Sequence, residues 1–109
     1  MLPNGVNAVV EIEKLTNYCL SPEHPRGRNK ARVFAAATGF TAEHADQLRE
    51  ALLQAARTQI AVPTEVDDFG QRFVIDFWLD GPTGSAEVRS SWIILTNDDV
   101  PRLTSCYVL

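Results

Sequence analysis

Cysteine and histidine, the residues that most often bind transition metals, are scarce in this chain. Among 109 residues there are two cysteines and two histidines. Cys19 and Cys106 lie far apart, form no Cys-x-x-Cys pair and have no histidine cluster beside them, so the spacing of a zinc site is absent. We therefore predict no metal site and no cofactor. Two reduced, partly buried thiols are expected, since a disulfide between them would need a proximity that sequence cannot show.

Long apolar runs are also absent. No stretch approaches the roughly 18 apolar residues that a membrane span requires, and residues 1–5 lack the basic segment of a signal peptide. The composition, with 45% hydrophobic and 22% charged residues, is that of an ordinary globular protein. We expect one cytoplasmic domain over residues 1–109, with no membrane partner.

Positive charge is in deficit. Ten Lys and Arg face fourteen Asp and Glu, for a net charge of −4, which argues against general nucleic-acid binding because such binding depends on neutralising phosphates. The basic charge is nevertheless local, since Arg26, Arg28, Lys30 and Arg32 lie within seven positions. A small anion site remains open to this chain.

Hydrophobic periodicity predicts helices first and strands last. Apolar residues recur at helical spacing over residues 11–20, from Arg28 to Gly39, and from Thr41 to about Ile60. Beyond Pro63 the pattern alternates, which predicts strands over 72–79, 85–95 and 102–108 and a weaker one within 62–69. The fold expected is α+β, with N-terminal helices packed on one face of a C-terminal antiparallel sheet of three to four strands.

Alternation divides the predicted strands into two faces. We expect the last strand to be central or near-central in the sheet. The face under the helices is predicted to carry Phe73, Ile75, Val88, Trp92, Leu103 and Tyr107. The open face is predicted to carry Arg72, Asp76, Arg89, Ser91, Arg102 and Thr104.

The first candidate site is the segment from His24 to Lys30. It combines an imidazole, a glycine that allows close approach of a ligand, and cations near the start of a helix, where anions are favoured. Imidazole can act as a general acid or base, and Lys or Arg can stabilise a transferring phosphoryl group. The alternative is a solvated helix face on which His24 only shapes a turn.

The second candidate lies on the predicted sheet. Arg102 and Thr104 are two residues apart and should point the same way, beside Arg89 and Ser91 of the neighbouring strand. An anion could bind there. The alternative is a cross-strand polar lattice, such as Arg89 against Asp76.

Several short motifs carry a resemblance to a known family. They run in order along nearly the whole chain: residues 14–25, then Gly27, Lys30-Ala31 and Phe34, then Asp68-Phe69-Gly70, Trp92-Ile93 and residues 101–104. In them the chain resembles a bacterial domain of unknown function (domain of unknown function 6883), similar to modules at the C-terminal tips of polymorphic, contact-dependent toxins. In layout it is more distantly similar to metal-independent ribonuclease toxins such as barnase, the colicins and RelE.

The resemblance implies a toxin-like endoribonuclease. Its pattern of a His-Pro pair, a following Gly and Lys, and a late Arg-Leu-x-Thr matches residues 24, 25, 27, 30 and 102–104. By this pattern His24 or Lys30 would move the protons, while Lys30 and Arg102 would hold the phosphate and Thr104 would orient it. Arg26, Arg28 and Arg89 are candidate binding residues.

Two functions therefore remain open. An endoribonuclease would have RNA and a cognate immunity protein as partners, and would need the four catalytic candidates to converge on one pocket. A non-catalytic interaction module, or an inactive relative of the toxin, would bind the product of a neighbouring gene and needs no such convergence.

Overall fold

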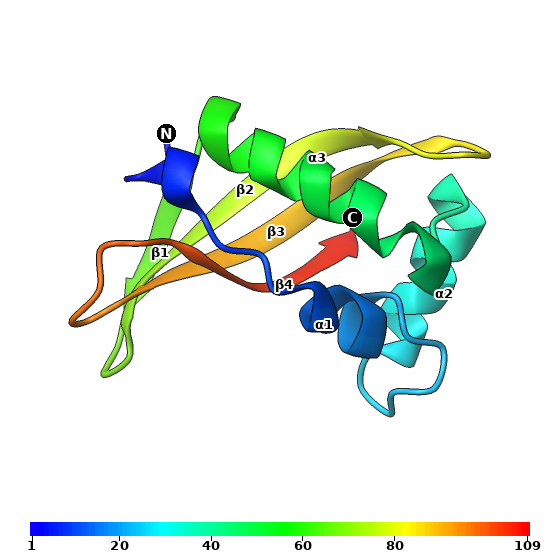
Figure 1. Ribbon diagram of the computed structural model, residues 1–109, viewed down its shortest axis with the longest axis horizontal. Coiled ribbons are helices and arrows are strands. Elements are labelled where there is room, and N and C mark those ends of the chain that lie inside the picture. The colour runs from blue at the N-terminus through cyan, green and yellow to red at the C-terminus, as the bar shows by residue number, and fades with distance from the viewer.

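The computed structural model describes residues 1–109 and has the α+β layout expected from the sequence (Figure 1). The two longer helices are α2 (Arg28–Thr38) and α3 (Ala45–Thr58), and no helix is long and apolar enough to cross a membrane. The shorter helical turns are η1 (Gly5–Asn7), α1 (Ile12–Lys14), η2 (Leu15–Cys19) and η3 (Ala42–His44). The strands are β1 (Val62–Val66), β2 (Gly70–Asp80), β3 (Ser85–Leu95) and β4 (Arg102–Val108).

The four strands form an antiparallel meander in the order β1-β2-β3-β4. Figure 1 shows α3 lying across the sheet and α2 beside its end, and α3 packs on β2 while α2 packs on β3 and β4. The prediction of a central last strand is wrong, because each strand follows its neighbour through a short turn and β4 is left at the edge. Only Val9 pairs with its outer side, in a parallel bridge to Arg102.

The predicted inner face is correct except near the end of β4. Phe73, Ile75, Val88, Trp92 and Leu103 are buried, but Cys106 is fully buried and Tyr107 is only half-buried. The cause is a β-bulge: Ser105 pairs with Ser91 and Leu103 pairs with Trp92, so that Thr104 is an extra residue in β4. An extra residue inverts the alternation of side chains beyond it.

One buried polar contact fixes the centre of the sheet. The Trp92 indole Nε1 donates to the Ser90 hydroxyl at 2.9 Å, and that hydroxyl donates to the Ile75 carbonyl at 2.9 Å. All three residues have no exposed surface. Both polar groups of these side chains are therefore satisfied inside the core.

The N-terminal helices differ from their predicted form. The first is broken into α1 and the π turn η2, in which the Leu20 N–H donates to the Leu15 carbonyl at 2.8 Å. The third ends at Thr58 with Ile60 77% exposed, so that Ile60 is not part of its buried stripe. The second ends as predicted at Gly39, whose φ of 81° is left-handed and suits glycine.

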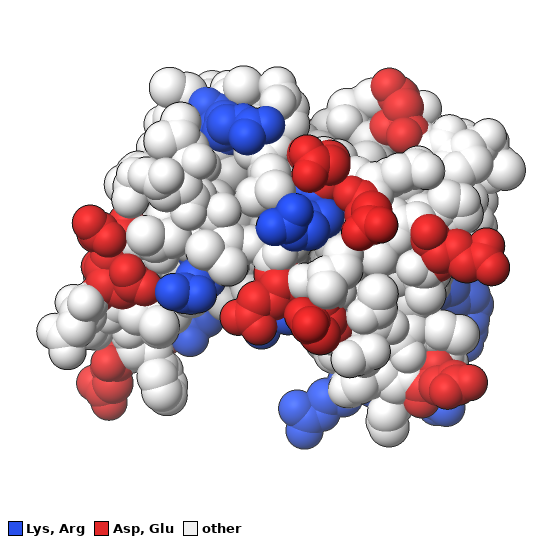
Figure 2. All heavy atoms as spheres, viewed as in Figure 1, with Lys and Arg blue, Asp and Glu red and all other residues white.

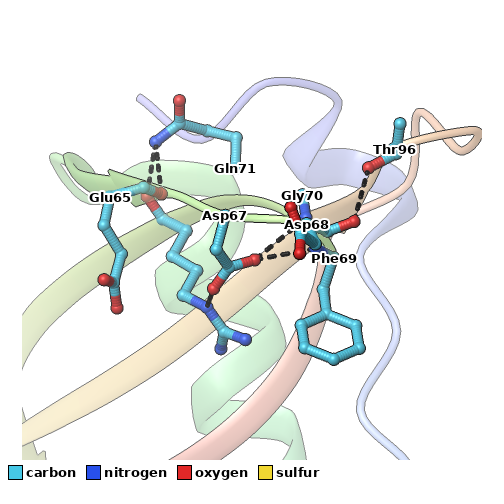
Figure 3. Close-up of polar contacts among 8 residues, drawn as sticks. Glu65, Asp67, Asp68, Phe69, Gly70, Gln71 and Thr96 are labelled. Atoms are coloured by element: carbon cyan, nitrogen blue, oxygen red, sulfur yellow. Dashed lines mark hydrogen bonds and ion pairs between the residues drawn. The ribbon is translucent and has the colours of Figure 1, made fainter.

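The turn between β1 and β2 is organised by a single carboxylate (Figure 3). Asp67 Oδ1 accepts the backbone N–H groups of Phe69 and Gly70 at 2.9 and 3.2 Å, and its Oδ2 pairs with Arg72 Nε at 2.8 Å. These bonds, led by the one from Arg72, hold the pKa of Asp67 below its ordinary value. Arg72, one of the three arginines predicted for the open face, is thus already neutralised by Asp67.

Candidate functional site

A polar cleft of about 330 Å³ is lined by residues of α1, η2, the loop after them and β4. Figure 1 shows these elements meeting at the β4 edge of the sheet, where η2 contacts β4. We call this cleft the edge cleft. Its lining consists of Lys14, Tyr18, His24, Arg26 and Thr104. The structure therefore brings together three sequence candidates, His24, Arg26 and Thr104, from distant parts of the chain.

Lys30 reaches the edge cleft through Tyr18. Its Nζ donates to the Tyr18 hydroxyl at 2.9 Å and to the Ser105 hydroxyl at 3.4 Å. Since the Tyr18 oxygen accepts from the ammonium group, its own proton is free to be donated to a ligand. Lys30 thus supports a cleft residue and is not part of the lining.

The ring of His24 is held in one tautomer by the backbone. Its Nδ1 accepts the N–H groups of Arg26 and Gly27 at 3.0 and 3.1 Å, so the neutral ring carries its proton on Nε2. Nε2 forms no hydrogen bond within the protein, which leaves an N–H donor for a ligand. With Nδ1 occupied by two backbone donors, the ring offers a ligand a donor and no acceptor.

His24 also shapes the entry to α2, as the alternative reading of the sequence expected. Its carbonyl accepts the Arg28 N–H at 2.9 Å, and its backbone N–H donates to the Ser21 hydroxyl at 3.2 Å. The ring packs edge-on against Tyr18, with centroids 4.8 Å apart. One histidine therefore both starts the helix and positions the phenol.

Glycine is required in the loop for this arrangement. At Gly27 a Cβ atom would overlap the carbonyl oxygen of Tyr18. Only a residue without a side chain lets the loop approach η2 so closely. The glycine of the His24 to Lys30 segment therefore serves the cleft by placing its walls in contact.

Arg102 and Arg89 lie outside the edge cleft and are neutralised by acids. Arg102 Nε pairs with Asp98 at 3.3 Å, and Arg89 forms two bonds of 2.8 Å with Asp76. The bond from Arg89 lowers the pKa of Asp76. Thr104 donates to the Ser91 carbonyl at 3.1 Å. The second candidate site is thus a cross-strand polar lattice, and Arg102 does not join His24 in one pocket.

The cations of the edge cleft, in contrast, are free. Lys14 and Arg26 form no ion pair, nor does Lys30 behind Tyr18, and no acidic residue lines the cleft. Figure 2 shows basic and acidic side chains interspersed over one face of the molecule, with no continuous basic surface. A concentrated site for one anionic group therefore fits this protein better than a broad nucleic-acid-binding face.

Arg28 points to a different hollow, of about 620 Å³, between α2 and η3. Its lining is mainly apolar and small, with Arg28, Arg32 and Glu43 among its charged members. The candidate binding residues are thus split, because Arg26 lies in the edge cleft, Arg28 in this hollow and Arg89 on the open sheet face.

Sequence reasoning missed Lys14 and Tyr18. Their spacing of four residues places them on one side of a helix, apart from the buried Leu15 and Cys19. Both also belong to the first motif that carried the family resemblance. That spacing was the available signal, although Tyr18 lies in a π turn, which no periodicity predicts.

A comparison with curated proteins found no match to this chain. A comparison with family models found a match described as Domain of unknown function (DUF6883), which extends over residues 1–109. The motifs from Lys14 to Thr104 that suggested this family lie within the matched range. The chain belongs to the DUF6883 family of domains of unknown function.

Proposed function

We propose that this protein is a cytoplasmic, toxin-like endoribonuclease whose edge cleft cleaves RNA without a metal ion. The four residues predicted to converge do not all line one pocket, because Arg102 pairs with Asp98 and Lys30 lies behind Tyr18. The observation that carries the proposal is instead the set of unpaired cations and proton donors in one cleft. Lys14 and Arg26 provide positive charge, while Tyr18, His24 and Thr104 provide polar hydrogens or oxygens. A phosphodiester carries one negative charge and accepts several hydrogen bonds, so it matches this lining.

Charge stabilisation is the main contribution expected from the cleft. When the 2′-hydroxyl attacks phosphorus, negative charge builds on the non-bridging oxygens, and Lys14 and Arg26 offset it. The Nε2–H of His24 adds a neutral donor. Because these groups are already placed before the reaction, they need little rearrangement as charge develops.

Tyr18 takes the proton-transfer role that the resemblance gave to His24 or Lys30. The 2′-oxygen forms a bond to phosphorus and loses its proton to water, while the bond from phosphorus to the 5′-oxygen breaks. Tyr18 protonates that leaving oxygen, and the Lys30 ammonium at 2.9 Å stabilises the tyrosinate. The products are a 2′,3′-cyclic phosphate and a free 5′-hydroxyl, and a proton from water restores the phenol.

The test is cleavage of a single-stranded RNA by purified protein in the presence of a chelator. Tyr18→Phe keeps the ring and removes only the hydroxyl, and it should slow cleavage by about 100-fold or more, the usual contribution of general acid catalysis. Lys14→Ala should also reduce the rate, whereas Arg57→Ala, an equal loss of charge on α3, should not. Expression of the wild type in bacteria should arrest growth, and Tyr18→Phe should relieve the arrest.

Intact RNA after incubation with the folded wild type, or equal rates for wild type and Tyr18→Phe, would refute the proposal. The second candidate function would then take precedence. This is a non-catalytic module that binds the product of a neighbouring gene, and the hollow beside α2 favours it. Ala35→Glu, which introduces a carboxylate into the small-residue wall of that hollow, should then abolish co-purification of the two proteins.

A further inference from the structure

Two cysteines lie behind the edge cleft, and the mechanism above uses neither. Cys19 is the last residue of η2 and directly follows Tyr18, while Cys106 lies in β4 two residues beyond Thr104. Both are free thiols with no exposed surface, and both belong to the same core cluster. Each wall of the cleft therefore carries one buried sulfur.

The two walls meet at these residues. η2 packs against β4, and a single Lys30 Nζ lies 2.9 Å from the Tyr18 hydroxyl and 3.4 Å from the Ser105 hydroxyl. Tyr18 and Ser105 are the residues immediately before the two cysteines. Lys30 thus bridges the residues that precede the two cysteines, and this contact between η2 and β4 is independent of the thiols.

The chemistry of the thiols is unequal. A hydrogen bond from the Cys106 side chain, with smaller contributions from the Cys106 backbone, Ser105 and the charge of Lys30, lowers the pKa of Cys19 to about 7 despite its burial. Interaction with Cys19 and burial raise the pKa of Cys106. Cys19 is therefore the thiol that becomes a nucleophilic thiolate near neutral pH, with Cys106 placed to react next.

We propose that Cys19 and Cys106 form a reversible disulfide that ties η2 to β4 and closes the edge cleft. The bond itself is independent of the proposed function, whereas its effect on RNA cleavage rests on that function. The oxidant is a small hydroperoxide such as hydrogen peroxide, which reaches the sulfurs during local opening of η2 from β4, since neither sulfur is exposed in the folded state.

The reaction balances in two steps. The Cys19 thiolate attacks one peroxide oxygen, the O–O bond breaks, and the departing hydroxide takes a proton to become water, which leaves a sulfenic acid. The Cys106 sulfur then attacks the Cys19 sulfur, the S–O bond breaks, and the departing hydroxide takes the Cys106 proton to become a second water. Two thiols lose one electron each, and the peroxide gains both.

The disulfide would change the cleft because it is short. An S–S bond measures about 2.05 Å, which is shorter than the closest approach of two unbonded sulfur atoms. The bond also usually holds the two Cα atoms about 4.4–6.8 Å apart. Formation of the bond therefore draws η2 toward β4. Since Tyr18 and Thr104 line the cleft from these two elements, the space for a phosphate shrinks.

The bond is tested by mass spectrometry of the reduced, folded protein after exposure to hydrogen peroxide, with remaining thiols alkylated under denaturing conditions. We expect a monomer that has lost two hydrogens, a peptide joining Cys19 to Cys106, and reversal by dithiothreitol. Cys106→Ser should instead stop at a Cys19 sulfenic acid, which dimedone traps. The proposal would be overturned by thiols that can still be alkylated after peroxide treatment, by separate over-oxidation of each cysteine, or by a linked dimer. All three outcomes are measured on the wild type, so none depends on whether a variant folds.

The effect on the cleft is tested separately by titrating inorganic phosphate and by assaying RNA cleavage before and after oxidation. We expect at least tenfold weaker phosphate binding and slower cleavage in the linked form, both restored by dithiothreitol. A linked protein with unchanged phosphate binding would overturn closure of the cleft. If the reduced protein cleaves no RNA, the proposed function fails, while mass spectrometry and phosphate binding still decide the disulfide and its effect.

Discussion

Replacing His24 with alanine and with asparagine should separate its two tasks. The Oδ1 of asparagine occupies nearly the position of histidine Nδ1, one bond from Cγ, so it can accept the same N–H groups of Arg26 and Gly27. Asparagine has no counterpart of Nε2. His24→Asn should therefore keep the start of α2 while removing the donor to the ligand, and His24→Ala should remove both.

The magnitudes follow from the contacts. Each of the two backbone hydrogen bonds contributes about 0.5–1.5 kcal/mol, and the one from Arg26 is exposed and belongs at the lower end. The edge-on contact with Tyr18 adds about 0.5–1.5 kcal/mol. We expect His24→Ala to lower the free energy of unfolding by about 2 kcal/mol and His24→Asn by about 1 kcal/mol.

Urea denaturation followed by fluorescence measures these differences in the free energy of unfolding. The RNA assay reports the other task of His24, the donation from Nε2 to the ligand. In thermal unfolding the alanine variant should melt roughly 8–12 °C lower, since about 1 kcal/mol shifts the Tm of a domain of this size by roughly 4–6 °C. Both variants should cleave RNA more slowly than the wild type at temperatures where both are folded. If asparagine is as destabilising as alanine, Nδ1 is not the acceptor and the assigned tautomer is wrong.

Three further substitutions test single contacts in the loop and the sheet. Gly27→Ala should destabilise the protein by about 1–3 kcal/mol in urea denaturation, because its methyl group meets the Tyr18 carbonyl; wild-type stability would show that the loop can move away. The hydrogen bond from Arg89 is the main cause that lowers the pKa of Asp76 below its ordinary 3.8. The ionised carboxylate therefore stabilises the fold above pH 3.8, and this stabilisation is lost as the pH falls through the lowered pKa. Asp76→Asn should therefore be less stable than wild type at pH 7, with the gap closing below about pH 4, and a gap independent of pH would contradict this. Ser90→Ala leaves a buried indole N–H without an acceptor and should cost about 1–3 kcal/mol in a urea titration, and no change would mean that the indole finds another acceptor.

Periodicity predicted the elements of the fold well and their local irregularities poorly. The helix that ends at Gly39 and the strands over residues 85–95 and 102–108 have clear sequence signals. The extra residue Thr104 has none, because a bulge depends on pairing with another strand, and it reversed the predicted orientation of Tyr107. The edge position of β4 likewise depends on how the strands are ordered, which alternation alone does not encode.

The candidate site was predictable in part. His24 and Thr104 line one cleft, as their joint membership in a motif pattern suggested. Arg102 was misplaced because its neighbour Asp98, four residues earlier, satisfies it locally. Ion pairs between exposed side chains are settled by local geometry, so a sequence shows which charges are present without showing which remain unpaired.

The π turn of η2 makes the cleft sensitive to the length of the chain as well as to its composition. A π turn spans one residue more than an α turn, and each residue of a helix rotates by about 100°. Deleting Asn17 would let the segment relax to an ordinary α turn and swing Tyr18 away from Thr104, although every lining residue would still be present. Within the family, a one-residue gap at this position would therefore mark members that keep the fold and have lost the cleft.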